Sequence, residues 1–302
     1  MSFIPLIIRP KNLFSSESSL KYFLTQTLAS AIFLFAIIFL YFLSNFKINL
    51  VIFIPALISS TMLLKRGAAP FHFWLPSVIE GLSWNTNIIL ITWQKIAPLI
   101  IISYCLNFKL LIFIIFLSIF FGRVGGLNQT SLRKLIAFSS INHLGWIIAG
   151  ILNREIIWIT YFLFYCFLSL SIVFVFNNFN ILNISQSFRK FNSIFFVKIF
   201  MFLSLLSLGG LPPFLGFFPK WLIIELLISR KIFFMLLFML FFTLLTLYFY
   251  LRISYAALII NHLEINWNFK IFYQIKSQKP LIVFSFFSLF GLLLINMIFY
   301  FF

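Results

Sequence analysis

Long apolar runs, separated by short polar stretches, cover most of the chain. Most of them are about 20 residues or longer, which is enough for a helix to cross a bilayer. None alternates apolar and polar residues with a period of two, so the pattern predicts helices and not barrel strands. We therefore expect an all-α polytopic membrane protein with about nine transmembrane helices, at 20–43, 48–79, 84–106, 109–122, 134–152, 155–177, 194–229, 232–260 and 281–301.

Two of these segments, 48–79 and 194–229, are too long for one straight crossing. Each contains a cluster of glycine and proline, GAAP in the first and GGLPP in the second. Proline has no amide hydrogen and disrupts a helix, so the clusters predict two discontinuous helices. Broken helices in the two halves of a membrane protein are a sequence signal of an ion pathway.

Composition excludes several classes of function. Of the 302 residues, 63% are hydrophobic and 9% are charged, which is typical of membrane proteins. The net charge is +17, but the basic residues lie in short loops between apolar runs, so we expect no nucleic-acid partner. Cys105 and Cys166 lie in separate apolar runs, and no cluster of Cys, His and carboxylates has metal-ligand spacing. We therefore expect no redox site in this chain.

Loop charges predict how the chain is oriented. Lysine and arginine accumulate in loops on the side of a membrane that corresponds to the cytoplasm. We therefore expect the N-terminus on that side and, with nine spans, the C-terminus on the other. The more basic loop set contains Arg9, Lys11, Lys21, Arg123, Arg133, Lys134, Arg189, Lys190, Lys270, Lys276 and Lys279, and the opposite set contains Lys47, Lys109, Arg154, Arg230 and Lys231.

Three lysines lie within or beside apolar segments, where a charge is unfavourable and indicates function by default. Lys95 is roughly 16 Å along a helix from the start of its span. It either takes up and releases a proton as its surroundings change, or bonds carbonyls that Pro98 frees. Lys220 is interpreted as a proton relay with Glu225 as a polar neighbour. Lys65 is either an anchor at a helix end or a residue beside the first break, and these two interpretations stay open.

Other polar side chains extend this picture. His143 lies mid-span in the string SSINHLGW, and it either exchanges protons or forms a hydrogen bond between packed helices. His72 either lines the first break or bonds a carbonyl that the break frees. Lys198, one turn inside its span, is interpreted as an anchor that reaches the membrane surface.

Several strings resemble one known family. The strings KRGAAPFHFWLP, LITWQKIAP, GGLNQTSLRKLIAFSSINHLGW and SLGGLPPFLGFFPKW occur in the family's order, and SSLKYFLTQTLAS and LYFYLRISYA also fit. On these residues the sequence resembles mitochondrial NADH dehydrogenase subunit 2 in its insect-like form, over nearly the whole chain. That family consists of antiporter-like subunits in the membrane arm of respiratory complex I.

The resemblance implies roles for particular residues. By motif position, Lys65 is the central lysine of the first broken helix and Lys95 the connecting lysine on the next helix. Lys220 is the lysine of the second broken helix, on the exit side. His143 falls on the polar axis between two half-channels. The resemblance thus favours a functional role for Lys65, which sequence physics alone leaves open.

The resemblance also implies a setting. We expect a core subunit of proton-translocating NADH:ubiquinone reductase in the mitochondrial inner membrane, with the N-terminus in the matrix and the C-terminus in the intermembrane space. No cofactor is expected here, since NAD, FMN, iron–sulfur clusters and ubiquinone belong to other subunits. The expected partners are other membrane-arm and accessory subunits and membrane lipids, and not a second copy of this chain.

The start of the chain departs from the family pattern. Family members normally begin with two further helices, and the second carries a glutamate that pairs with the lysine at position 65. The sequence MSFIPL matches the family just beyond that glutamate. We therefore expect antiporter-like inverted repeats with a truncated first repeat at 1–152, a second at 153–260, and a loop and C-terminal helix at 261–302. A true truncation, helices from another chain and a misplaced start each account for the departure.

Two other functions are compatible with the sequence. The first is a structural membrane-arm subunit that no longer conducts protons, which the missing glutamate favours. The second is a stand-alone cation/proton antiporter, which the scarcity of acidic residues within the spans disfavours. The lysines inside apolar segments favour proton translocation over the structural role.

Overall fold

The computed structural model describes residues 13–46, 53–190, 195–256, 283 and 286–292. Regular structure in these residues is helical, with no strand, which confirms the all-α class. Five helical segments are long and apolar enough to cross a membrane. Most of the ninth predicted span, 281–301, and all of the loop predicted at 261–280 lie outside the described residues, so the count of nine stays a prediction. The five segments are Leu13–Phe42, Trp84–Tyr104, Leu132–Asn153, Glu155–Asn178 and Phe233–Tyr255.

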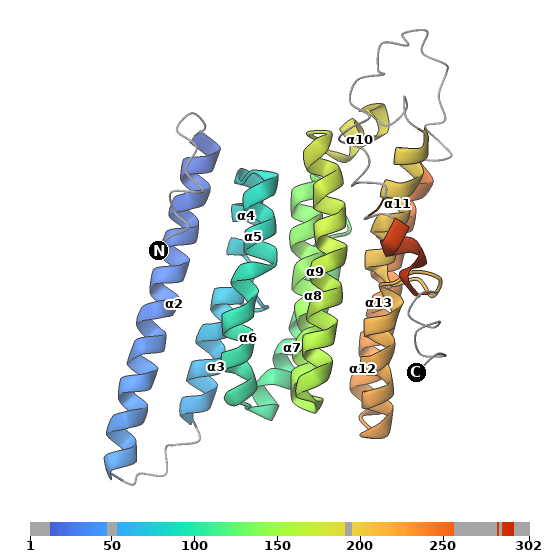
Figure 1. Cartoon of the computed structure of the whole chain (residues 1–302). Helices are drawn as coiled ribbons and strands as arrows, with labels where there is room; N and C mark the ends of the chain where they lie inside the picture. Colours follow the sequence, from blue (N-terminus) through green and yellow to red (C-terminus); the bar gives the residue numbers. More distant parts are fainter. Residues whose placement is uncertain (1–12, 47–52, 191–194, 257–282, 284–285, 293–302) are drawn as a thin grey trace. The chain divides into compact units, whose positions relative to one another are not determined.

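The described residues form two compact units (Figure 1). The first runs to Gly125 and adds Arg133–Trp158, and the second contains Gly126–Leu132 and the chain from Ile159 onward. The first unit holds α2 (Leu13–Phe46), α3 (Phe53–Arg66), α4 (Trp74–Gly81), α5 (Trp84–Ile91), the 3-10 turn η2 (Trp93–Lys95), α6 (Ile96–Tyr104), α7 (Phe108–Val124) and nearly all of α8 (Leu132–Asn153). The second holds most of α9 (Glu155–Asn178), then α10 (Ile184–Lys190), α11 (Phe195–Gly209), α12 (Phe217–Ser229) and α13 (Phe233–Tyr255).

The first long segment is broken where its glycine and proline cluster lies. Helix α3 ends at Arg66, and α4 begins only at Trp74. Gly67 has φ +67°, and a Cβ atom there would lie 2.8 Å from the Leu75 side chain, so the turn requires glycine. The Trp74 indole Nε1 donates a hydrogen bond of 3.0 Å to the Leu64 carbonyl. A side chain of the second half-helix therefore satisfies a carbonyl at the end of the first.

The second long segment is broken in the same way. Helix α11 ends at Gly209, Gly210 has φ +80°, and α12 begins at Phe217. A positive φ of this size is easily accessible only to glycine, which explains the residue type at the break. Both discontinuities expected from the sequence are therefore present.

Two elements differ from the sequence prediction. The span expected at 84–106 is divided into α5, η2 and α6, with the 3-10 turn directly before the turn that contains Pro98. The stretch expected to be a polar loop at 178–193 contains the short helix α10. The Gln186 side-chain oxygen accepts the backbone amide of Leu182 at 2.9 Å, which anchors the start of that helix.

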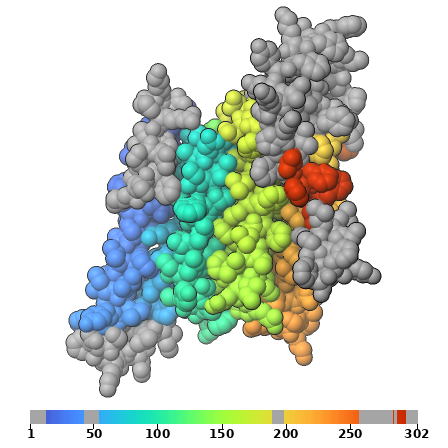
Figure 2. Space-filling model, in the orientation of Figure 1, coloured from blue at the N-terminus to red at the C-terminus, as the bar shows by residue number. Residues whose placement is uncertain are grey.

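Burial differs sharply between helices. Most of α8 is inside the protein, with 94% of its most apolar 18-residue window buried. Gly122 and Gly145 allow α7 to approach it, since a Cβ at Gly122 would lie 2.7 Å from the Asn142 backbone nitrogen. By contrast only 11% of the α2 window is buried, and its apolar side chains, blue in Figure 2, form an outer surface suited to lipid or another subunit.

Candidate functional site

Helix α8 places a group of polar side chains in the interior of the first unit. Ser139, Ser140, Asn142 and His143 are all buried, with at most 5% of their surface exposed. The two serine hydroxyls donate to the carbonyls of Ile136 and Ala137 one turn earlier, at 2.8 and 2.7 Å. This local bonding makes a buried hydroxyl tolerable in a membrane helix. The polar segment predicted around His143 therefore exists and is buried.

Lys95 connects to this polar segment. It ends the 3-10 turn η2, is 2% exposed, and its ammonium donates to the Ser140 carbonyl at 3.4 Å. Pro98 has no amide hydrogen and cannot bond the carbonyl four residues earlier, so the chain tightens into a 3-10 turn here. Next to Lys95, the Gln94 side chain accepts a 2.8 Å hydrogen bond from the Tyr22 hydroxyl of α2. Hydrogen-bonded side chains thus link α2, η2 and α8.

Lys65 lies at the end of α3, beside the first break. Its side chain is half-buried, and its ammonium lies over the Phe33 ring of α2, 5.3 Å from the centroid. The side-chain amide of Gln26 donates to the Lys65 carbonyl at 3.3 Å. Within the part of the chain that the structure describes, Lys65 makes no ion pair. The residue is therefore both at a helix end and beside a break, so geometry alone does not separate its two interpretations.

The first break also contains a buried histidine. His72 is 4% exposed and stacks on Phe121 of α7, with the two ring centroids 5.0 Å apart. It therefore lines the break and packs that irregular segment against α7, and it also hydrogen-bonds the Pro70 backbone within the break, so both interpretations apply.

Arg123 was wrongly interpreted from the sequence as a loop charge. It belongs to the last turn of α7, is completely buried, and its Nε donates to the Asn142 side-chain oxygen at 2.9 Å. The predicted span 109–122 ends two residues too early, because α7 continues to Val124. Gly122 brings the backbones of α7 and α8 together, and this close approach carries Arg123 into the interior. The sequence signal was the glycine directly before the arginine.

Lys220 is the corresponding lysine in the second unit. It lies in the first turn of α12, is 3% exposed, and its ammonium donates to the carbonyl of Gly209 at the end of α11. A Cβ atom at Gly210 would lie 2.6 Å from the Lys220 nitrogen, so glycine leaves the space that the ammonium uses. The C-terminal end of a helix carries partial negative charge, which favours a cation there. Lys220 therefore joins the two halves of the second broken helix.

Two interpretations around Lys220 were wrong. Glu225 is exposed on α12 and is not a buried neighbour of Lys220, because five residues along a helix turn a side chain well away from the first. Lys198 of α11 was expected to reach the membrane surface, yet it is only 6% exposed. Helix geometry alone accounts for Glu225, whereas the burial of Lys198 depends on what packs against α11.

Comparison with known proteins agrees with this architecture. A family model described as the transmembrane part of the NADH:quinone oxidoreductase/Mrp antiporter family matches residues 1–246, and a model of the NADH dehydrogenase subunit 2 C-terminus matches residues 247–299. The chain is 52% identical over 301 residues to NADH-ubiquinone oxidoreductase chain 2 of Anopheles gambiae, covering 99% of this chain and 88% of that protein. This chain belongs to the NADH-ubiquinone oxidoreductase chain 2 family. The family expected from the sequence strings is confirmed.

Other members and solved structures extend the comparison. NADH-ubiquinone oxidoreductase chain 2 of Aedes aegypti is also 52% identical over 99% of this chain and 88% of its own length. A chain of respiratory complex I from Thermus thermophilus shares the fold with a TM-score of 0.81 and 21% identity, over 96% of this chain and 69% of that one. A chain of an archaeal membrane-bound sulfane sulfur reductase has a TM-score of 0.80 and 17% identity, over 95% and 64%. These two structures support the antiporter-like fold.

The described part of the chain offers no metal site. No group of three or more His, Cys, Asp or Glu side chains among the described residues is arranged to hold a metal ion. The chemistry available in the two units is that of buried lysines, two buried histidines and hydroxyl groups. Such groups bind and pass protons.

Proposed function

We propose that this chain is a membrane-arm subunit of proton-translocating NADH:ubiquinone reductase and that it moves protons through lysine-centred half-channels. The observation that carries the proposal is the shared geometry of Lys95 and Lys220. Each is almost completely buried, each lies at a helix irregularity, and each donates to a backbone carbonyl of another helix. A buried ammonium is unfavourable in a bilayer and is retained where it has a function.

The proposed roles follow from this geometry. Lys95 binds a proton on its side-chain nitrogen, with the Ser140 carbonyl as one partner that stabilises the charged form. His143, three residues further along α8, accepts or supplies a proton on the same polar segment. Lys65 loads protons at the first break, and Lys220 releases them at the second. The first repeat at 1–152 and the second at 153–260 each contain one broken helix.

The energy for this transfer comes from outside the chain. We assign NAD, FMN, iron–sulfur clusters and ubiquinone to other subunits, whose electron transfer changes the electrostatic surroundings of the lysines. The partners are membrane-arm and accessory subunits in the mitochondrial inner membrane. From the distribution of loop charges we infer that the N-terminus lies in the matrix and the C-terminus in the intermembrane space.

Lys95→Met tests the proposal. The substitution keeps an unbranched side chain but removes the protonated nitrogen, so we expect NADH-driven proton pumping by the isolated complex to fall by about tenfold or more. Pumping is measured in vesicles on complex whose assembly is verified on native gels. Lys21→Met is the matched control, since Lys21 is exposed and pairs with Glu17 at 2.5 Å. Normal pumping by an assembled Lys95→Met complex overturns the relay.

A structural subunit that does not conduct is the second candidate. It is favoured by Lys65, which has no ion pair among the described residues and so has no anion there to stabilise its charge. On this alternative, Lys65→Met and Lys95→Met both leave the number of protons pumped per NADH unchanged. The proposed function expects both substitutions to lower it.

A further inference from the structure

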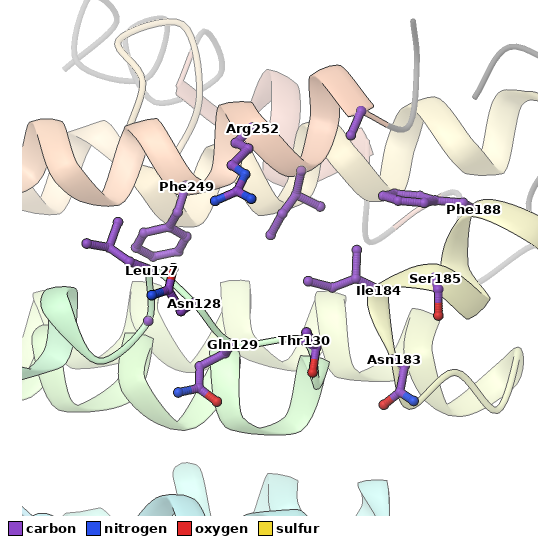
Figure 3. A pocket seen from close by; sticks show the side chains of 13 residues that line it. Leu127, Asn128, Gln129, Thr130, Asn183, Ile184, Ser185, Phe188, Phe249 and Arg252 are labelled. Carbon is purple, nitrogen blue, oxygen red and sulfur yellow. The ribbon is translucent and has the colours of Figure 1, made fainter. Parts of the chain in front are cut away.

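A pocket of about 620 Å³ lies wholly within the second unit (Figure 3). One wall is the 126–130 segment before α8, another is the start of α10, and the third is the last turns of α13. Two strings that carry the family resemblance, GGLNQT and LYFYLR, therefore meet here. The proposed proton path uses neither of them.

The described lining of the pocket carries a positive charge. Among the described residues that line the pocket, Arg252 is the charged one and none is a carboxylate. Its side chain is exposed and makes no hydrogen bond or ion pair within the described residues. In Figure 3 it faces the wall that holds Asn128 and Gln129. A free guanidinium opposite neutral amide groups suits an anion, and its fork of donors matches a phosphate or carboxylate group.

The position of the pocket in the fold indicates which class of anion it suits. Arg252 lies in the last turn of α13, one of the five candidate spans, and the 126–130 segment ends just before another. The pocket therefore lies where spans end, at the depth of lipid headgroups. Its lining also includes the apolar side chains of Phe188, Phe249 and Ile253. This mixture of one cation, neutral donors and apolar surface fits a charged headgroup joined to a lipid better than a small free anion.

The alternative is that Arg252 only anchors the end of α13 at the membrane–water interface. That role needs water or headgroups in general, and no pocket. Here the guanidinium instead shares a cavity with the side chains of Asn128 and Thr130, which also make no hydrogen bond within the described part of the chain. Three unused polar groups around one cavity indicate a binding site.

We propose that this pocket binds the phosphodiester headgroup of an anionic phospholipid, with Arg252 as the charged contact and Asn128 and Thr130 as neutral ones. The bound lipid links the segment before α8 to the end of α13. The inference does not depend on the proton path, because Lys95 and Lys220 do not line the pocket.

Photolabelling of the assembled complex tests the site. The complex is placed in phosphatidylcholine nanodiscs that contain phosphatidylglycerol with a photoreactive group on its headgroup, and labelled peptides are identified by mass spectrometry. We expect label on peptides that contain 126–130 or 249–253. Arg252→Gln should reduce this label about tenfold, as expected for the loss of one charge-assisted hydrogen bond. Lys231→Gln is the matched control, since Lys231 is exposed and lies just before the opposite end of α13.

Competition identifies the source of the phosphate group. Unlabelled phosphatidylglycerol should suppress the label, whereas phosphatidylcholine and inorganic phosphate should not. Suppression by millimolar inorganic phosphate assigns the pocket to a free anion and overturns the lipid proposal. Equal labelling in the wild type and in Arg252→Gln also overturns it. A second variant, Asn128→Leu, should lower the label without changing the charge, and an unchanged signal excludes Asn128 as a contact.

Discussion

Three buried cations of this chain donate hydrogen bonds to neutral groups. Lys95 bonds the Ser140 carbonyl, Lys220 bonds the Gly209 carbonyl, and Arg123 bonds the Asn142 side chain. Removing one partner of a buried charge is more destabilising than removing both, because the remaining charge keeps its desolvation penalty. This asymmetry gives a direct test at Arg123.

We expect the pair Arg123 and Asn142 to be strongly coupled. Asn142→Leu removes the hydrogen-bond acceptor of the completely buried Arg123 guanidinium. It should therefore destabilise the assembled complex by about 2–3 kcal/mol. The double variant Arg123→Leu/Asn142→Leu removes charge and partner together, and should be more stable than Asn142→Leu alone. Thermal unfolding of the complex measures both. Additive effects of the two substitutions contradict the bond as an important contact.

At the scale of elements, the sequence predicts both helix breaks and misses the third irregularity. The breaks at Gly67 and Gly210 are visible because glycine and proline cluster in segments too long for one crossing. Pro98 was equally visible, but a single proline in a membrane helix is compatible with a kink or a break. Only packing against α8 shows that it produces a 3-10 turn at Lys95.

The burial of particular side chains and the presence of a short helix also could not be predicted from the sequence. Arg123 and Lys198 are buried because of the helices around them, and a charge next to a loop looks the same whether or not another helix covers it. Helix α10 is seven residues long, too short to be stable by propensity alone. It is supported by the local hydrogen bond between Gln186 and Leu182 and by the bridge between Ser131 and Asn183, which are distant in sequence.

Pro98→Ala tests the role of the 3-10 turn. The alanine regains an amide hydrogen that can bond the Gln94 carbonyl, so the turn should relax toward an α-helix and move Lys95 relative to Ser140. We expect proton pumping to fall severalfold, about the effect of misplacing one reacting group, while the complex still assembles. Pro76→Ala is the control, since Pro76 lies in the first turn of α4, where its missing amide hydrogen has no helical partner. Unchanged pumping in Pro98→Ala shows that the turn does not position Lys95.

At the scale of the whole molecule, each of the two units contains one broken helix and at least one buried lysine. The outer face of α2 is apolar and almost entirely exposed, which a neighbouring subunit or lipid must cover. These features are those of a component of a larger membrane assembly.

We expect the purified chain alone to be inactive in liposomes. On the proposed function, its lysines change charge only when chemistry in other subunits alters their surroundings, so a sodium or potassium gradient should drive no proton movement above that of protein-free vesicles. A pH-sensitive dye inside the liposomes measures this, and the intact complex supplied with NADH serves as the positive control. Cation-driven proton exchange by the chain alone favours the antiporter.

The contact between Lys220 and Gly209 has a mechanical meaning. The Lys220 side chain connects α12 to the end of α11 by a hydrogen bond across the turn at Gly210. This bond restrains movement of the two half-helices about that turn. A protonated lysine forms a charge-assisted hydrogen bond to a carbonyl, whereas a neutral amine forms a weaker hydrogen bond. The rigidity of the turn between α11 and α12 therefore depends on whether the Lys220 side chain is protonated. A subunit built in this way couples the presence of one proton to the rigidity of a helix.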